Sequence, residues 1–347
     1  MCAFFGPNDV VVKEADLREA IRLRSESERL KWFSSSGAVI EEDVPSQFGH
    51  LVSYWLTRFS NIRPATLAAL QANAVDPATN YGILTVKTTS DAAVATAAAN
   101  VAAQLVNGVV DATIPPNLTD LVASAIISAN ASLRDLEETG PWSAVFVTAV
   151  IRSTAIQLGL EGLAAGQHVG SDELLKGSSA HAVYTLTAYQ NRFGAAPRRG
   201  TYLAFRTDER TPQVGDIIIQ DRKKNLTFPN VVAFNNIPTA LATGRALHGD
   251  IVVEVPDGAD YVVTIGGNLG NSTRRRRYPL DADRHLVVSR TQLYVQEDDN
   301  GVLGNLPVVN NAAGLNPLST GRIFALLSPV DECAAVPGQP YHGGVLV

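Results

Sequence analysis

The stretch GPWSAVFV at residues 140–147 decides the fold, together with LHGDIVV at residues 247–253. In the first stretch a proline suits the opening turn of a helix, where its missing N–H costs nothing, and an apolar run follows. The second stretch places a histidine ahead of β-branched residues, which are typical of a strand. A hydroxyl at a helix start and an imidazole on a strand are the minimum set of groups for acyl transfer.

The composition is that of an ordinary globular protein, with 46% hydrophobic and 18% charged residues. A chain of 347 residues is long enough for two domains, or for one domain with a large extension. The net charge of −6 and a pI near 5.5 argue against nucleic-acid binding, which needs a basic surface.

The sequence indicates neither a membrane span nor a leader. No run approaches the roughly 18 apolar residues that cross a bilayer. Residues 1–11 lack the charged and apolar regions of a signal peptide, so we expect a protein that is cytoplasmic when made. Cys2 and Cys333 are too few for a disulfide framework or a zinc cluster, and neither opens a plausible helix.

The order of the predicted elements is helices first and strands later. Amphipathic or Ala-rich patterns predict helices over residues 14–33, 46–59, 91–106, 119–136, 142–158 and 179–192. Alternating β-branched patterns predict strands over 202–206, 216–220, 231–234, 250–255, 261–265, part of 286–296, and 322–327. This order predicts an α+β fold with an antiparallel sheet rather than βαβ units.

Shifts in composition suggest three parts. Residues 1–138 form a helical N-terminal region with a docking or accessory role. Residues 139–299 form the main domain, and residues 300–347, which are rich in Gly, Asn and Pro, form an extension packed on it.

Ser143 is the first candidate site residue. The free N–H groups and partial positive charge of a helix start would stabilise an alkoxide or an oxyanion there. The alternative is that Ser143 only satisfies backbone donors, as serine often does near helix starts.

His248 and Asp250 form the second candidate. They are two residues apart on a strand, so both side chains point to one face, and Asp250 could orient the imidazole. Alternatively, His248 is a plain strand-end histidine and Asp250 a solvated charge.

Three further residues are supporting candidates. Asn268, in the sequence IGGN at 265–268, could hold a histidine tautomer as the third member of a triad, although Gly-Gly-Asn is also ordinary turn chemistry. His181 lies in a helix first turn and lines the same cleft or has a structural role. Trp142 precedes Ser143.

Four consecutive arginines, Arg274–Arg277, would alternate between the two faces of a strand. A solvated sheet edge is the favoured interpretation, and binding of an anionic partner is the alternative. The sequence holds no phosphate-binding loop, dinucleotide fingerprint or ligand spacing for a metal, so neither a cofactor nor a metal is expected.

The order of these motifs resembles a known group of enzymes. WSAVFV at 142–147 is similar to the WCAxFV helix start of CHAP and NlpC-type cell-wall peptidases. TPQVGDII at 211–218 is similar to their GD-hydrophobic strand, HGDIV at 248–252 to their histidine strand, and TIGGN at 264–268 to the strand ending that supplies the third residue. The nearest pattern is that of an uncharacterised bacterial family allied to them, PWSAxF…H…GD…HxDIVV…GGN.

The resemblance covers about residues 140–288 and implies a compact papain-like domain. It implies that Ser143 is the nucleophile, His248 the general base and Asn268 the orienting group. The departure is that these peptidases carry cysteine at the serine position, and a hydroxyl depends more on its base and oxyanion hole than a thiol does.

Three functions are therefore expected as alternatives. The first is an amidase or peptidase acting on peptidoglycan stem peptides, delivered by lysis or by an injection system. The second is a non-catalytic cell-wall-binding or structural component of a phage tail or injection apparatus, with a tail-machine protein as partner. The third is an amide-directed toxin, or effector, acting on a host protein.

Overall fold

The computed structural model describes most of the chain, and the structural statements below concern that part. The described residues are 3–5, 10–42, 44–59, 61–75, 91–109, 115–133, 142–160, 174–194, 201–222, 232–242, 245–287, 294–306 and 322–330. Cys2 and Cys333 lie outside these ranges, as do Gly140 and Pro141.

The described helices include the six that the sequence predicts and two that it does not, Pro64–Ala74 and Ile237–Leu241. They are α1 (Glu14–Leu30), α2 (Phe48–Leu56), α3 (Pro64–Ala74), α5 (Asp91–Asn107), α6 (Leu118–Leu133), α7 (Ser143–Gln157), α8 (His181–Phe193) and α9 (Ile237–Leu241), with short 3-10 turns at Pro45–Gln47 and Phe234–Asn236.

Most strands follow helix α8. A small hairpin pairs β1 (Ala3–Phe5) with β2 (Val11–Lys13). The other strands are β3 (Tyr202–Phe205), β4 (Ile217–Asp221), β5 (Leu247–Glu254), β6 (Tyr261–Gly266), β7 (Arg274–Pro279), β8 (Val295–Gln296) and β9 (Arg322–Pro329). They form a seven-stranded sheet in the order β3-β9-β4-β5-β6-β7-β8, and every neighbouring pair is antiparallel. The predicted α+β class is confirmed.

The two faces of this sheet bury different sets of residues. We call the face that packs on α1 and α7 the helix face; it carries Ile217, Ile219, Ile251 and Ile265, which belong to the main core. The opposite face carries Ile218, Val252, Val262 and Tyr278 in a second cluster. Strand alternation separates the two sets, since neighbouring residues of one strand point to opposite faces.

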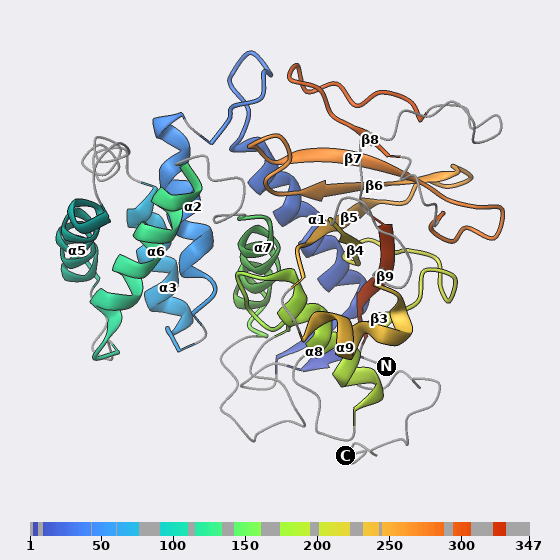
Figure 1. Ribbon diagram of the computed structural model, residues 1–347, viewed down its shortest axis with the longest axis horizontal. Helices are drawn as coiled ribbons and strands as arrows, with labels where there is room; N and C mark the ends of the chain where they lie inside the picture. Colours follow the sequence, from blue (N-terminus) through green and yellow to red (C-terminus); the bar gives the residue numbers. More distant parts are fainter. Residues whose placement is uncertain are drawn as a thin grey trace.

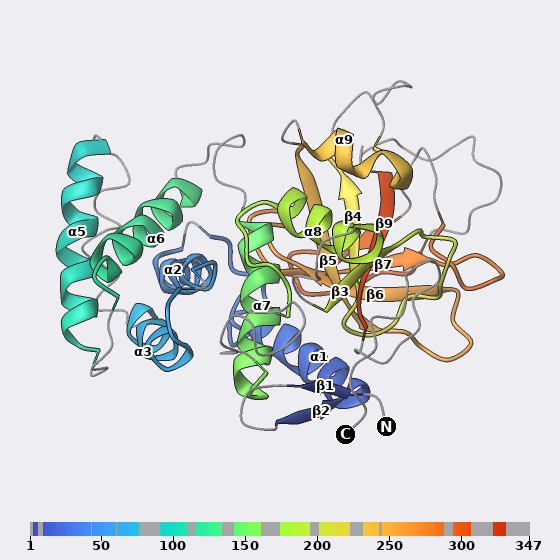
Figure 2. The same cartoon turned by 90° about the horizontal axis from the view of Figure 1, so that it is seen from below.

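Helix α7 occupies the centre of the molecule. In two perpendicular views it lies between the group formed by α2, α3, α5 and α6 and the sheet (Figures 1 and 2). Its residues from Ser143 to Ala155 are all buried, which explains why most of them are apolar. Such a helix has neighbours on every side.

Helix α1 is tied to the sheet by a buried ionic network. Arg18 donates to Asp216 at 2.9 Å and to Ser328 of β9 at 3.1 Å, and Ser328 in turn donates to Asp216 at 2.6 Å. The GD motif, Gly215-Asp216, thus has a structural role. Gly215 adopts the left-handed backbone conformation, with φ +86°, and Asp216 links α1 to β9 through Arg18 and Ser328. The domain boundaries remain predictions, but α1 and β9 both contribute to the core of the sheet layer.

Two expectations about the strands are wrong. Residues 232–234 do not form a strand. The side chain of Asn236 accepts a hydrogen bond from the N–H of Ala233, and the chain turns there to begin α9. The four arginines do not form a solvated edge, because β7 is paired on both sides, with β6 and β8. Arg274 and Arg276 are buried, and Arg275 and Arg277 are partly buried.

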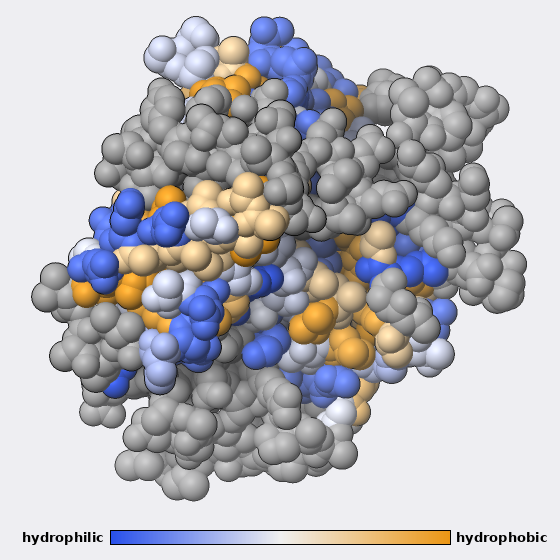
Figure 3. Space-filling model, turned by 60° about the vertical axis from the view of Figure 1, so that its left-hand side comes forward, coloured by the Kyte–Doolittle hydropathy of each residue, from blue (hydrophilic) through white to orange (hydrophobic). Residues whose placement is uncertain are grey.

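The helical end presents a mixed surface. Hydrophobic and hydrophilic side chains are interspersed on the side seen in Figure 3, which brings that end forward. Among the described helices, none is both long enough and apolar enough to span a membrane.

Candidate functional site

Ser143 is hydrogen-bonded to a histidine. Its hydroxyl lies 2.7 Å from Nε2 of His181, the first residue of α8. Ser143 is itself the first residue of α7, and no side chain caps that helix start. The first N–H groups of α7 have no acceptor within the helix, so they could stabilise negative charge beside the serine.

Tyr184 supports the other side of the His181 ring. Its hydroxyl lies in hydrogen-bond contact with Nδ1 of His181, one helical turn away. Gly249 lets this pair lie directly against β5. A Cβ on Gly249 would be 2.9 Å from His181 Nδ1 and 3.0 Å from the Tyr184 hydroxyl.

His248 has a different, charged environment. Its Nε2 lies 2.7 Å from the Asp250 carboxylate, on the face that strand alternation gives to both residues. Asp250 also accepts hydrogen bonds from Tyr278 and from Arg276, the latter at 3.3 Å. Gln220 of β4 completes this network through Tyr278.

The expected pairing of Ser143 with His248 is not the one found; Ser143 pairs with His181. The reason is the direction of side chains along β5. Gly249 faces α8 on the helix face, so His248 and Asp250 point to the opposite face. The two histidine rings still come close, with centroids 5.6 Å apart.

Asn268 lies in the turn between β6 and β7, with φ +56°. Within the described part of the chain its side chain has no hydrogen bond to His181 or His248. The glycines before it admit other groups: a Cβ on Gly266 would overlap the Asp250 carboxylate, and one on Gly267 would lie 2.6 Å from Phe146. The two glycines therefore let Asp250 and helix α7 lie close to the backbone at this turn. The catalytic role of Asn268 stays a prediction.

Trp142 anchors the start of α7. Its indole stacks on Trp32 with centroids 4.6 Å apart, and its N–H donates to Glu42. Tyr54 of α2 packs beside the same indole. Trp142 thus fixes Ser143 against residues that precede the main domain in the sequence.

Burial controls the protonation of the site. Ser143, His181 and His248 are 1%, 5% and 2% exposed. Burial lowers the pKa of His181 well below its ordinary value, and the neighbouring His248 lowers it further. Burial also lowers the pKa of His248, although Asp250 acts in the opposite direction. His181 is consequently a neutral base at neutral pH, as proton acceptance from a serine requires.

Asp250 and the tyrosines behave oppositely. Burial alone would raise the pKa of Asp250, but His248 and Arg276 hold it below its ordinary value. Burial raises the pKa of the Tyr184 and Tyr278 hydroxyls well above the ordinary value. Both phenols therefore remain protonated, and Asp250 remains ionised.

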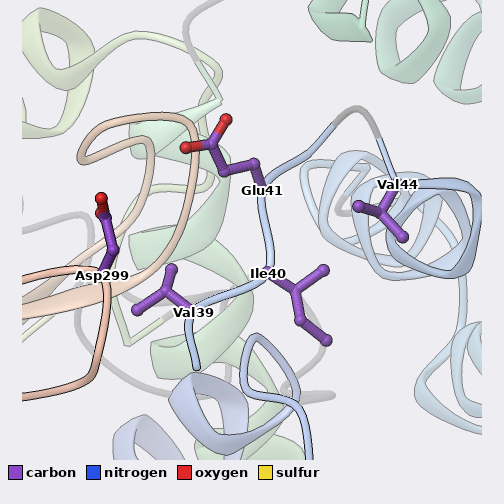
Figure 4. Close-up of a pocket in the computed structure, with 5 residues that line it drawn as sticks. All are labelled: Val39, Ile40, Glu41, Val44 and Asp299. Atoms are coloured by element: carbon purple, nitrogen blue, oxygen red, sulfur yellow. The ribbon is translucent and has the colours of Figure 1, made fainter. Parts of the chain in front are cut away.

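Two other features lie away from these residues. A hollow of about 470 Å³ beside the segment after α1 is lined by Val39, Ile40, Glu41, Val44 and Asp299 (Figure 4).

Ligand atoms of Asp281, Asp283 and His285 lie within 4.8 Å of one another on a surface turn. Since Asp281 already accepts the backbone N–H groups of Asp283 and His285, we interpret that group as a turn.

The sequence contained a usable indication of His181. Ser178 and Ser179 precede a helix in which His181 and Tyr184 are three residues apart, and residues at this spacing share a helix face. The choice between His181 and His248 as the partner of Ser143 depends on how α7 and α8 pack on β5, which no local pattern gives.

The site and fold thus define an α+β protein with a buried serine–histidine pair at a helix start. The model of one family, described as "Uncharacterized protein conserved in bacteria (DUF2272)", matches residues 115–304. This is more than half of the chain, which therefore belongs to that family, and the expected membership of an uncharacterised bacterial family is confirmed. No curated protein and no solved structure matches the chain. These comparisons do not link it to the CHAP or NlpC-type peptidases.

Proposed function

We propose that the protein is a hydrolase of amide or peptide bonds, with Ser143 as nucleophile and His181 as general base. The observation that carries the proposal is the 2.7 Å contact between the Ser143 hydroxyl and His181 Nε2 at the start of a buried helix. A nucleophile within reach of a neutral base, which a third group orients, is the general arrangement of nucleophilic catalysis.

The proposed mechanism uses only groups of this chain. The Ser143 oxygen attacks the amide carbonyl carbon while its proton passes to His181 Nε2. The first N–H groups of α7 stabilise the oxyanion, and His181 then gives the proton to the leaving amine. Water releases the acyl group from Ser143. Tyr184 holds the ring from the Nδ1 side.

The proposed substrate is a peptidoglycan stem peptide, and the proposed relationship is to papain-like cell-wall peptidases. Their support is the order of motifs and the packing of a nucleophile-bearing helix on an antiparallel sheet. The proposal requires that the protein reach the cell wall through lysis or an injection system.

The test is turnover of purified muropeptides followed by mass spectrometry. Wild type, Ser143→Ala and His181→Gln are compared, with His50→Gln as a control at a histidine of α2. We expect the Ser143 and His181 variants to lose about 10²-fold or more in rate and the control to keep the wild-type rate. Equal rates in all four proteins would end the catalytic proposal.

A second function is favoured by the burial of Ser143 and His181. On this proposal the pair is a structural hydrogen bond, and the protein binds the cell wall or forms part of a phage tail or injection apparatus. A pull-down with insoluble peptidoglycan tests this second proposal. Binding by both the wild type and Ser143→Ala, with no turnover by any variant, supports it. Ser143→Cys separates the two proposals further, since a rise in turnover shows that the remaining groups are competent.

A further inference from the structure

His248 and Asp250 have no part in the mechanism above, yet they are among the most buried polar groups of the described chain. The ring of His248 lies 5.6 Å from that of His181, centroid to centroid. Gly249, which follows His248 on β5, has no side chain, and a Cβ there would lie 2.9 Å from Nδ1 of His181.

The two histidines differ in how well a proton would be accommodated. A proton on His248 would face the Asp250 carboxylate at 2.7 Å. A proton on His181 would face the hydroxyls of Ser143 and Tyr184, which are neutral. The first proton is therefore bound more favourably at His248.

The other charged groups nearby do not change this order. Arg276 from β7 offsets part of the Asp250 charge, and Arg222, after β4, acts on both histidines in the same direction. Tyr278 and Tyr184 stay neutral because burial raises their pKa values. Asp250 is in direct contact with His248, and its carboxylate makes no hydrogen bond to His181 within the described residues.

We propose that His248 takes up the first proton in acidic solution and that its charge, on a ring 5.6 Å from that of His181, keeps His181 unprotonated. His248 is then a positioning residue, because its charge acts on the reaction by changing the protonation of His181. The result is a serine–histidine pair that retains its base at a pH below the range in which an isolated histidine would lose it.

The size of the effect follows from the separation. Two unit charges 5.6 Å apart change each other's pKa by about 0.5 to 2 for effective dielectric constants of roughly 80 to 20. Such coupling gives two macroscopic titrations for the pair.

The direct test is a titration of the imidazole resonances by NMR in the full-length protein. The key variant is His248→Gln, whose amide can still donate to Asp250 from the Nε2 position while the titrating ring is removed. We expect the pKa of His181 to rise by about 0.5 to 2 in this variant. His50→Gln, the same change at a histidine of α2, should leave the His181 titration unchanged.

A kinetic test uses p-nitrophenyl acetate as the acyl donor. The ratio of the acylation rate at pH 5 to that at pH 7.5 should fall in His248→Gln and stay at the wild-type value in His50→Gln. A merely structural role for His248 would lower both rates together and leave the ratio unchanged.

The kinetic part rests on the proposed function, whereas the titration does not. An unchanged His181 titration in a folded His248→Gln protein overturns the inference even if muropeptides are cleaved. A shifted titration in a protein that hydrolyses nothing supports the coupling and counts against the hydrolase alone.

Discussion

The two faces of the sheet handle a buried histidine in opposite ways. On the helix face, His181 is held by the neutral hydroxyls of Ser143 and Tyr184. On the opposite face, His248 is held by Asp250, which is itself paired with Arg276. The neutral set, Ser143 and Tyr184, offers no negative charge to a protonated imidazole, whereas in the ionic set the Asp250 carboxylate does. The same side chain is thus buried in an uncharged environment on one face and in an ionic environment on the other.

The largest effect is expected from Asp250→Asn, which breaks the ionic set. Arg276 would be left buried without its counterion, a change that costs about 3–5 kcal/mol of unfolding free energy. Urea unfolding measures the loss. Asp208→Asn, in an exposed ion pair with Arg206, is the control and should change little. Similar losses of unfolding free energy in Asp250→Asn and Asp208→Asn would contradict the expectation that the buried ion pair contributes more than the exposed one.

A smaller effect is expected from Gly249→Ala, which inserts a methyl group between β5 and the neutral set. The new Cβ would meet His181 and Tyr184 at about 3 Å, and relieving such overlap costs about 1–3 kcal/mol. Unfolding midpoints measure the loss against Gly304→Ala, whose Cβ would lie 3.4 Å from Val295. If both alanines are tolerated equally, His181 is not seated against Gly249.

A matched pair of tyrosine variants compares the two sets directly. Tyr278→Phe removes a donor to the ionised Asp250, and Tyr184→Phe removes the neutral partner of His181. Hydrogen bonds to charged groups contribute more, so we expect losses of about 2 and about 1 kcal/mol respectively. Denaturant titration gives both values. The reverse order would mean that the neutral set is the more tightly held.

The smallest effect is a dependence of stability on pH. Burial lowers the pKa of both His181 and His248 in the folded state, so the unfolded chain binds protons first as the pH falls. Unfolding free energy should therefore decrease below about pH 6.5, the ordinary histidine value, and hold steady above it. Urea midpoints at pH 7.5 and 5.5 test this. His181→Gln should weaken the dependence, and His285→Gln, on a surface turn, should not.

The layers of the fold were predictable because they follow from local patterns. The isoleucines of β4 and the apolar run of α7 indicate burial, and the spacing of His248 and Asp250 gives their common face. The strand at 322–327 was also predicted, but its position between β3 and β4 was not. Position in a sheet depends on long-range pairing, which single-strand patterns do not encode.

The site was predictable only in part. Ser143 at a helix start and Asp250 beside His248 follow from sequence spacing. The partner of Ser143 does not, because a one-residue step along β5 moves a side chain to the other face, and Gly249 rather than His248 occupies the helix-facing position. The buried arginines were missed for a related reason: the pairing of β7 with the two-residue strand β8 leaves little trace in the sequence.

The place of β9 has a consequence for synthesis of the protein. Strands β3 and β4 are adjacent in sequence, but in the sheet they are separated by β9, whose residues 322–329 leave the ribosome more than a hundred residues later. The buried hydrogen bond from Ser328 to Asp216 likewise forms only after β9 has been synthesised. Contacts so distant in sequence form slowly. The nascent chain therefore carries Ser143 and His181 for a long interval before the sheet beneath them closes.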